Sequence, residues 1–437
     1  MAKNLINVGL VGLGTVGSGV VKVFQTNLDR IEERVGGKIK IKRLVDKFED
    51  RFKELNIENL KFSSDYNDIL NDPEIDIVVE LIGGIEPART ICLSAMKKGK
   101  HVVTANKAIL ARYWDEIMQT AQNSKVDIYL EASVGGGIPV IQGLHDGLAS
   151  NNIQAIYGIV NGTTNYILTR MAEGKDFKES LKEAQKKGYA EADSSFDIDG
   201  IDSAHKLAIL ASIAFNTTVD LKDIYTEGIA NITHHDFKYA KEEFGQVIKL
   251  LAIAKAENGK FEVRVHPTLI PSDHLLAAVD DVYNAIYVVG DIVGPVMFYG
   301  QGAGQMAAAS AIVSDIVYIA RNIYSGVAGK VPSVYYETKH LSAKNIVNIE
   351  DIKSRYYLRF TVLDQPGVFA TISGILGKYN ISIASVYQTE RKSGNKVPVI
   401  MMTYETLEKD IRIALAEIDN LSITKEKTLL IRVEKGI

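Results

Sequence analysis

Short apolar runs alternate with helical patterns over the first third of the chain. Residues 5–11 form an apolar run of strand length, and apolar residues at helical spacing follow from Val20 to Leu28. Residues 39–45 and 101–104 are further strand-like runs. Buried parallel strands read as continuous apolar runs, and their alternation with helices is typical of a parallel sheet. The pattern predicts an α/β domain, which we place at residues 1–132.

A glycine-rich turn joins the first expected strand to the first expected helix. Its sequence is Gly12-Leu13-Gly14-Thr15-Val16-Gly17. In such a G-x-G-x-x-G pattern, the first glycine permits the tight turn and the second lets the backbone approach a pyrophosphate. The third lets the helix pack closely on the strand, and the free amides at the helix start bind phosphate. The motif therefore predicts a Rossmann-type dinucleotide-binding domain.

The nucleotide itself is NAD or NADP. Asp46 ends the second expected strand, where an acid binds the ribose hydroxyls and favours NAD. Lys47 and Arg51 lie close by and suit a 2′-phosphate instead. A helix N-cap is an equally good interpretation of Asp46. The choice of cofactor stays open.

Thr104-Ala105-Asn106-Lys107 follows a later strand at its carboxyl end. Ligands of open α/β sheets bind at this edge. Lys107 is therefore a candidate to reach the nicotinamide or the substrate, although a surface lysine at a helix start is an equal alternative.

Polar and glycine-rich loops mark residues 133–325 as a central α+β domain for substrate. Residues 128–132 read as a strand entering the loop Ser133 to Pro139, which has three consecutive glycines. With Glu131 nearby, this loop suits phosphate, a hard cation or a plain hinge. The segment Asn161-Gly162-Thr163-Thr164-Asn165 opens a helix and suits a small carboxylate. Gly302 and Gly304 lie in another loop before a helix, a second candidate for backbone contact with the cofactor.

Charged side chains concentrate between residues 191 and 206. Five carboxylates and Lys206 lie within these sixteen residues. The spacing of Asp202 and Lys206 is i,i+4, so on a helix both lie on one face and meet the same ligand. A lysine held near a carboxylate and partly desolvated can move a proton near neutral pH. A solvated acidic loop is the alternative.

The C-terminal region reads as a separate module. Residues 326–353 are expected to be a linker. From residue 354 to 437, the order of expected elements is βαββαβ, which is the ferredoxin-like plan. Nothing in it looks catalytic, so we expect a sensor or assembly module.

Composition limits the remaining classes of function. The 437 residues suit two or three domains, and the net charge of −4 gives no reason to expect a nucleic acid or an anionic membrane as partner. The single cysteine, Cys92, excludes an intrachain disulfide and favours the cytosol. The N-terminus lacks signal-peptide features, and no apolar run reaches the roughly 18 residues that span a bilayer.

These segments together resemble homoserine dehydrogenase with a C-terminal ACT domain. The family signature is Ala-x3-Gly-Tyr-Ala-Glu-x-Asp-Pro-x2-Asp-Ile-x-Gly-x-Asp-x3-Lys. It is matched by Ala184, Gly188, Tyr189, Ala190, Glu191, Asp193, Asp197, Ile198, Gly200, Asp202 and Lys206. Ser194 replaces the proline, which should alter the stiffness of the loop more than its chemistry. Ala307-Ala308 replaces the Pro-Thr of many relatives, and Val45 stands where some carry arginine.

The resemblance implies roles for individual residues. Lys206 would be the proton donor and acceptor, Glu191 and Asp202 would hold the substrate amino group, and Lys107 would lie near the cofactor. The substrate-side motif would be Asn161, Gly162, Thr163 and Thr164. The cofactor would be contacted by Gly188, Thr104, Gly302 and Gly304. Glu131 and the carbonyls of Val134, Gly136 and Ile138 would hold sodium.

The resemblance also implies regulation and assembly. Asp364, Gly367 and Val368 belong to a segment that looks like the opening turn of an ACT domain, where an amino acid of the pathway, often L-threonine, acts as effector. The resemblance implies a homo-oligomer, either a dimer or a tetramer, with residues 133–325 as the catalytic and oligomerisation domain. Because the chain starts at the dinucleotide strand, we expect the monofunctional form, without an aspartokinase half.

The expected reaction interconverts L-homoserine and L-aspartate 4-semialdehyde in threonine, methionine and isoleucine biosynthesis. One rival is a semialdehyde dehydrogenase that acylates a cysteine, which would need Cys92 as a thiolate. Cys92 lies in an amphipathic helical stretch, where a buried structural cysteine is favoured. The other rival is a sensor that binds dinucleotide and amino acid without turnover.

Overall fold

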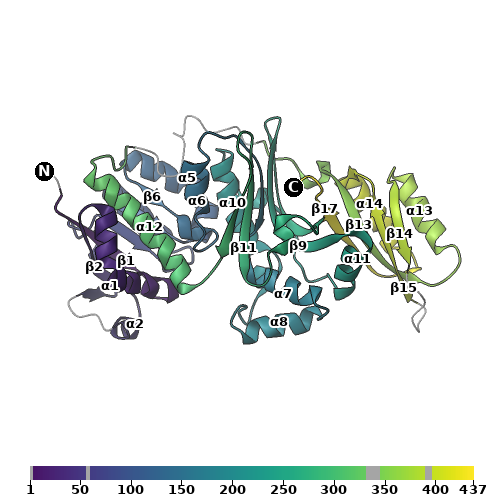
Figure 1. Ribbon diagram of the computed structural model, residues 1–437, viewed down its shortest axis with the longest axis horizontal. Coiled ribbons are helices and arrows are strands. Elements are labelled where there is room, and N and C mark those ends of the chain that lie inside the picture. The colour runs from purple at the N-terminus through teal and green to yellow at the C-terminus, as the bar shows by residue number, and fades with distance from the viewer. Residues whose placement is uncertain (1–2, 56–59, 331–344, 389–395) are drawn as a thin grey trace. The chain divides into compact units, whose positions relative to one another are not determined.

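The computed structural model describes residues 3–55, 60–330, 345–388 and 396–437, and Figure 1 labels its elements. Contacts divide the described residues into two compact units. The first takes residues in 1–160, 204–224 and 283–344, and the second takes residues in 161–203, 225–282 and 345–437. The linker expected at 326–353 includes residues 331–344, which lie outside the described residues.

The first unit contains a six-stranded parallel sheet of order β3-β2-β1-β4-β5-β6. Its strands are β1 (Leu5–Val11), β2 (Lys38–Val45), β3 (Lys61–Ser63), β4 (Ile77–Glu80), β5 (His101–Thr104) and β6 (Ile128–Tyr129). The connecting helices are α1 (Thr15–Val35), α2 (Glu49–Lys53), α3 (Asn67–Leu70), α4 (Ala88–Lys97) and α5 (Lys107–Ser124). This strand order is that of the doubly wound dinucleotide-binding fold, so the predicted Rossmann-type domain is confirmed.

The strand expected over residues 128–132 is shorter than predicted. β6 ends at Tyr129, and Glu131–Ser133 forms a 3₁₀ turn. The backbone amide of Glu131 donates to the Asp315 carboxylate at 2.9 Å, a side-chain partner that takes the place of a strand neighbour. The apolar pattern does not encode that contact.

Helix α12 (Gln305–Tyr324) packs against α1 in the core of the first unit. One buried cluster includes Val20, Val21 and Phe24 of α1 and Ile312 and Ile316 of α12. By length and composition α12 is apolar enough to cross a membrane, but half of its most apolar window is buried inside the protein. A core helix explains that composition. A helix from the expected second domain thus completes the core of the first.

The first unit also contains three antiparallel strands, β7 (Ile153–Ile159), β11 (Tyr283–Gly290) and β12 (Gly294–Gln301), which pair in the order β12-β11-β7. Short turns precede them, namely α6 (Val140–Gln142) and a π turn at Gly143–Gly147. Helix α10 (Ile201–Ala214) has its first three residues in the second unit and the rest in the first, and it is buried along most of its length.

The second unit begins with α7 (Gly162–Ala172), α8 (Phe177–Lys186) and the single turn α9 (Ser195–Ile198). The next elements are β8 (Tyr225–Thr226), α11 (His234–Phe244) and the long antiparallel hairpin of β9 (Gln246–Glu257) and β10 (Lys260–Pro271). Side-chain caps explain two helix starts, because Asn161 accepts from the Thr164 amide and Asp176 from the Glu179 amide.

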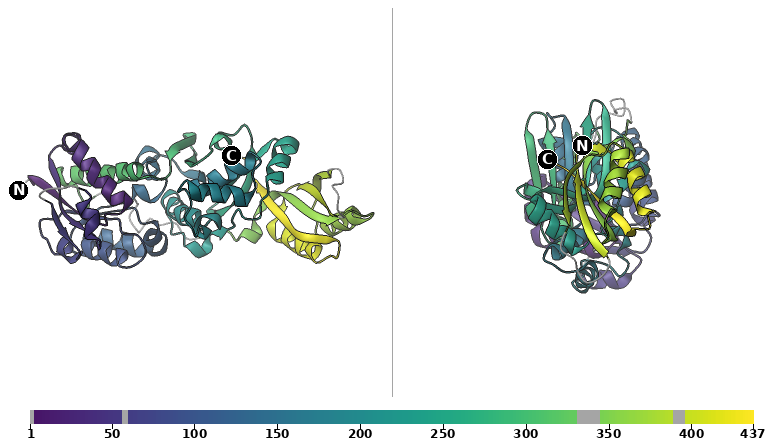
Figure 2. Two further views of the ribbon diagram at one scale, coloured as in Figure 1. Left: turned by 90° about the horizontal axis from the view of Figure 1, so that it is seen from below. Right: turned by 90° about the vertical axis from the view of Figure 1, so that its right-hand side faces the viewer.

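The C-terminal module has the predicted βαββαβ order, with one additional two-residue strand before its second helix. Its elements are β13 (Lys353–Leu363), α13 (Val368–Lys378), β14 (Ile383–Gln388), β15 (Lys396–Thr403), β16 (Thr406–Leu407), α14 (Glu408–Asp419) and β17 (Thr424–Val433). The sheet order is β17-β13-β15-β14, with both helices on one face (Figure 2). β17 also pairs with β10 through Thr268↔Arg432 and Leu269↔Val433. The ACT-like sheet is therefore continuous with the central hairpin of its own unit.

Candidate active site

The glycine turn has the geometry that the fingerprint needs. Gly12 has a φ of +104°, and its amide donates to the Val45 carbonyl at 2.8 Å. A Cβ on Gly17 would lie 1.9 Å from the Gly12 carbonyl oxygen, so only glycine lets α1 start this close to β1. A Cβ on Gly14 would meet nothing within 4 Å. The space beside Gly14 is thus open for a ligand to approach the backbone.

Asp46 organises the same turn from the end of β2. Its two carboxylate oxygens accept from the Leu13 amide at 2.6 Å and the Phe48 amide at 2.8 Å, and Arg51 lies 3.3 Å away. Helix α2 begins at Glu49 with Phe48 as its N-cap residue, so Asp46 is not a helix cap. The acid and a neighbouring cation lie beside the glycine turn together.

Glu80 lies at the carboxyl end of β4 and was not singled out from the sequence. It is fully buried, accepts from the Thr104 hydroxyl at 2.7 Å and accepts from the Ile82 amide at 2.9 Å. Burial raises the pKa of this carboxyl above its usual range. Lys107 is half-buried and opens α5 directly after the Asn106 cap. Thr104 and Lys107 therefore lie at the ligand edge of the sheet.

Glu131 is buried, and its carboxylate oxygens accept from the Ile141 and Gln142 amides at 2.8 Å each. Burial raises its pKa to about 7. Val134, Gly136 and Ile138 follow in the same buried loop, and the Ile138 carbonyl accepts from the Val140 amide. Among the described residues there is no group of three or more His, Cys, Asp or Glu side chains able to hold a metal. Any cation here would need carbonyl oxygens in addition to acidic side chains.

The two glycine loops of the first unit pack backbone to backbone. A Cβ on Gly136 would lie 2.6 Å from the Gly302 carbonyl oxygen, and one on Gly302 would overlap Asn284. Gln305, which follows Gly304, donates to the Ser18 hydroxyl in the first turns of α1 at 2.9 Å. The loop around Gly302 and Gly304 is thereby held next to the start of the nucleotide helix.

A compact polar cluster forms around Asn161 in the second unit. The Asn161 amide nitrogen donates to Asp197 at 2.7 Å and to Asp202 at 2.8 Å, while its oxygen accepts from Thr164. Asn161 and Asp202 are buried, and Thr163 donates to the Tyr189 carbonyl. Asn161 therefore fixes two carboxylates that lie 41 and 36 residues away in sequence. The glycines Gly162 and Gly188 flank the same segments, and Glu191 is exposed.

Asp202 and Lys206 lie one turn apart on α10, as their spacing predicts. Lys206 is only 9% exposed, and its ammonium donates to the Val160 carbonyl at 2.6 Å. The helix thus carries a buried acid and a buried lysine on one face.

Two further candidates have distinct surroundings. Cys92 is fully buried in α4, and burial raises the pKa of its thiol well above the usual range, which opposes a thiolate nucleophile. In the C-terminal module, Gly367 has a φ of +88° and precedes α13, with Asp364 half-buried and Val368 buried.

Comparison with known proteins covers nearly the whole chain. Residues 12–131 match the family model "Homoserine dehydrogenase, NAD binding domain", residues 139–317 match "Homoserine dehydrogenase", and residues 356–422 match "ACT domain". A homoserine dehydrogenase of Neisseria gonorrhoeae is 41% identical over 98% of both chains.

Solved structures agree. The crystal structure of a homoserine dehydrogenase from Thiobacillus denitrificans is 44% identical, covers 99% of this chain and 98% of its own, and superimposes with a TM-score of 0.93. A hyperthermophilic archaeal homoserine dehydrogenase in complex with NADPH is 26% identical, with a TM-score of 0.62 over 76% of this chain and 99% of its own. On this identity and coverage, the chain belongs to the homoserine dehydrogenase family.

Proposed function

We propose that the protein catalyses the reversible oxidation of L-homoserine to L-aspartate 4-semialdehyde, with Lys206 as the group that moves the proton. Family membership makes the chain an NAD(P)-dependent oxidoreductase that acts on a CH–OH group. The observation that carries the assignment of roles is the buried pair on α10, in which Asp202 and Lys206 lie one turn apart.

The cofactor would be held at the glycine turn. The open space beside Gly14 fits a pyrophosphate, and Leu13, Thr15, Val16 and Gly17 supply the backbone at the start of α1. A dinucleotide bound there would supply the acceptor and donor of the hydride that is exchanged with the alcohol carbon of the substrate. Asp46 favours ribose hydroxyls and the adjacent Arg51 suits a 2′-phosphate, so this pair would decide between NAD and NADP. The archaeal relative with NADPH supports the use of NADP.

Lys206 would act on the substrate oxygen. In the direction of alcohol formation its ammonium donates a proton to the oxygen of the aldehyde, and in the reverse direction its amine takes the proton of the hydroxyl. A buried ammonium near the developing oxyanion stabilises it far better than an exposed one. The Val160 carbonyl holds the Nζ atom in place before substrate arrives.

The amino group of the substrate is assigned to Asp202 and Glu191. Asp202 is preorganised because Asn161 already fixes its carboxylate, and Thr163 and Thr164 follow in the first turn of α7. Glu191 is exposed and therefore free to rotate toward a ligand. Lys107, at the ligand edge of the Rossmann sheet, would approach the cofactor.

Other parts of the proposal rest on the family alone. Sodium would be held by Glu131 and the carbonyls of Val134, Gly136 and Ile138. The C-terminal module would bind an amino-acid effector such as L-threonine at the turn formed by Asp364, Gly367 and Val368. A homo-oligomer in the cytoplasm, active in threonine, methionine and isoleucine biosynthesis, completes the proposal.

The test follows nicotinamide reduction with L-homoserine, using NAD⁺ and NADP⁺ in parallel. Lys206→Ala should lower kcat by about 10²–10⁴-fold with a much smaller change in KM, because general acid–base catalysis contributes about that factor. Lys178→Ala, an exposed lysine on α8, is the control and should keep the normal rate. Near-normal turnover of Lys206→Ala would overturn its assigned role. Dinucleotide binding by the wild type without any turnover would favour the sensor.

A further inference from the structure

The loop that carries Asp197 toward Asp202 is supported from behind by a short segment, residues 226–229. The Ile229 amide donates to the Ile198 carbonyl at 3.0 Å. A Cβ on Gly228 would lie 2.4 Å from the same carbonyl oxygen, so the two backbones are in direct contact. A Cβ on Gly200 would lie 3.2 Å from the Thr226 side chain. The position of the turn between Asp197 and Asp202 therefore depends on where segment 226–229 lies.

Glu227, which belongs to segment 226–229, holds that segment in place through its backbone and its side chain. The Glu227 amide donates to the Val265 carbonyl of β10 at 2.8 Å, which continues the pairing of β8 with β10. Its carboxylate accepts from the Tyr225 hydroxyl at 2.8 Å and from Arg432 at 2.9 Å. Arg432 belongs to β17 of the C-terminal module and lies 205 residues further along the chain. A charged pair thus joins that module to the segment behind the substrate loop.

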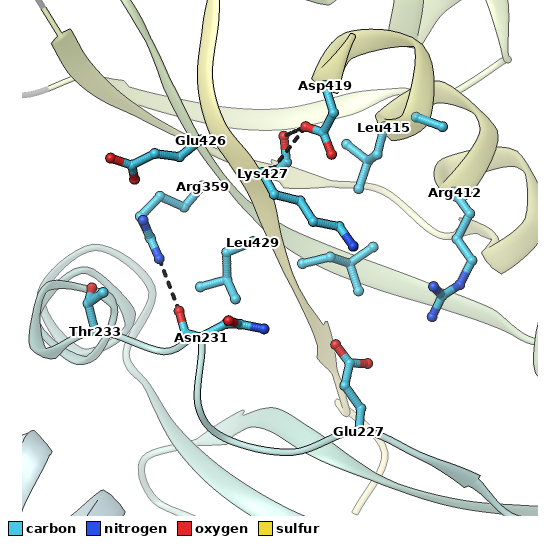
Figure 3. Close-up of a pocket in the computed structure, with 13 residues that line it drawn as sticks. Glu227, Asn231, Thr233, Arg359, Arg412, Leu415, Asp419, Glu426, Lys427 and Leu429 are labelled. Carbon is cyan, nitrogen blue, oxygen red and sulfur yellow. Dashed lines mark hydrogen bonds between the residues drawn. The ribbon is translucent and has the colours of Figure 1, made fainter. Parts of the chain in front are cut away.

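Arg432 is a rigid anchor. Its side chain is 1% exposed, and Glu408, also fully buried, accepts from its guanidinium. A buried cation held by a second carboxylate has little freedom to follow Glu227 if that residue moves. Glu227 has a 37% exposed side chain and lines a cavity of about 560 Å³ with Arg412, Asn231 and Lys427 (Figure 3). Glu227 is therefore the residue of this ion pair to substitute, because Arg432 still has Glu408 as its partner when Glu227 is replaced.

We propose that Glu227 is a positioning residue for substrate binding: tied to Arg432 of the C-terminal module, it holds segment 226–229 against Ile198 and so fixes the turn between Asp197 and Asp202. This inference rests on the proposed role of Asp202 in holding the substrate amino group. Because that contact exists both before and during hydride transfer, a displaced Asp202 weakens substrate binding uniformly, which raises KM and spares kcat.

The experiment compares Glu227→Ala and Glu227→Gln with Glu262→Ala in the full-length protein. Glu262 accepts from Arg264 on the same hairpin, and its side chain is 27% exposed, so it is a matched carboxylate without contact to the loop. Glu227→Ala should raise KM for L-homoserine about tenfold, while kcat and KM for the dinucleotide change less than about twofold. Glu227→Gln should restore part of the loss, because its amide oxygen still accepts from Arg432.

Two further variants keep the test decisive. Tyr225→Phe removes one donor to Glu227 with little change in shape and should shift homoserine KM in the same direction by a smaller factor. Gly228→Ala forces the segment away from Ile198 and should raise KM at least as much as Glu227→Ala. Unchanged homoserine KM in the folded Glu227 and Tyr225 variants would overturn the inference, as would an equal rise in Glu262→Ala. Wild-type protein that does not oxidise homoserine would instead overturn the proposed function.

Discussion

At the scale of single residues, Glu80 shows how burial of a carboxyl makes the stability of the protein depend on pH. Its pKa is raised because it is desolvated, although Thr104 and two backbone amides bind it. A raised folded pKa means that the folded protein binds more protons than the unfolded chain above about pH 4.5. Stability that depends on Glu80 therefore falls as pH rises through that range.

Glu80→Gln should remove this dependence of stability on pH. The free energy of unfolding of the variant should rise relative to that of the wild type from pH 5 to pH 8, because glutamine needs no ionisation in the buried position. Urea unfolding at both pH values measures it. A difference that is independent of pH would show that Glu80 titrates as an ordinary exposed acid.

Single residues also show what sequence reasoning can and cannot find. The spacing of Asp202 and Lys206 predicted their common helix face because both residues lie on one element. Glu80 and Glu227 carried no such signal. Their partners, Thr104 and Arg432, lie 24 and 205 residues away, and only the folded chain brings them together.

At the scale of elements, substitutions at the last two glycines of the nucleotide turn should separate an effect on cofactor binding from an effect on folding. Gly14→Ala adds a methyl group that meets no protein atom within 4 Å, so the fold tolerates it while the path of the pyrophosphate is narrowed. The dissociation constant of the Gly14→Ala variant for NADPH should rise about tenfold or more, with little change in Tm. Titration of the reduced cofactor by fluorescence gives the affinity.

Gly17→Ala is the matched variant of the same turn. Its methyl group would lie 1.9 Å from the Gly12 carbonyl oxygen, so α1 must shift away from β1. Overpacking of this kind costs about 1–3 kcal/mol, and both Tm and cofactor affinity should fall. If Gly14→Ala lost as much Tm as Gly17→Ala, the space beside Gly14 would be structural instead of a ligand path.

Elements were predicted best where local pattern decides them. Strands β1 and β5 have the expected bounds because a strand buried on both faces is a continuous apolar run. The long hairpin of β9 and β10 was not predicted, since its apolar residues show no clean period of two. The position of α12 beside α1 was also missed, because nothing in the local sequence says which helix an apolar face will meet.

At the scale of the whole molecule, the C-terminal module is tied into the second unit by buried charges as well as by the pairing of β17 with β10. Arg432 and Glu408 are both buried, and Arg264 of β10 bonds to Glu434 after β17. The pair of Arg264 and Glu434 crosses between the central hairpin and the C-terminal module, and Arg432 also reaches Glu227 outside that module. The second unit should therefore respond as one body when a buried charge is removed.

Glu408→Ala tests this coupling. Leaving Arg432 with Glu227 alone should cost about 3–5 kcal/mol, because a buried charge loses its principal partner. The only tryptophan, Trp114, is buried in α5 of the first unit, so its fluorescence reports on that unit, while far-ultraviolet circular dichroism reports on both. In urea, the dichroism of Glu408→Ala should begin to fall before the fluorescence of Trp114 changes.

The control is Glu417→Ala, at a more exposed carboxylate of the same helix, which should leave both transitions at their wild-type midpoints. Equal shifts of both signals in Glu408→Ala would mean that the destabilisation spreads through the whole chain, and that the two units do not unfold separately.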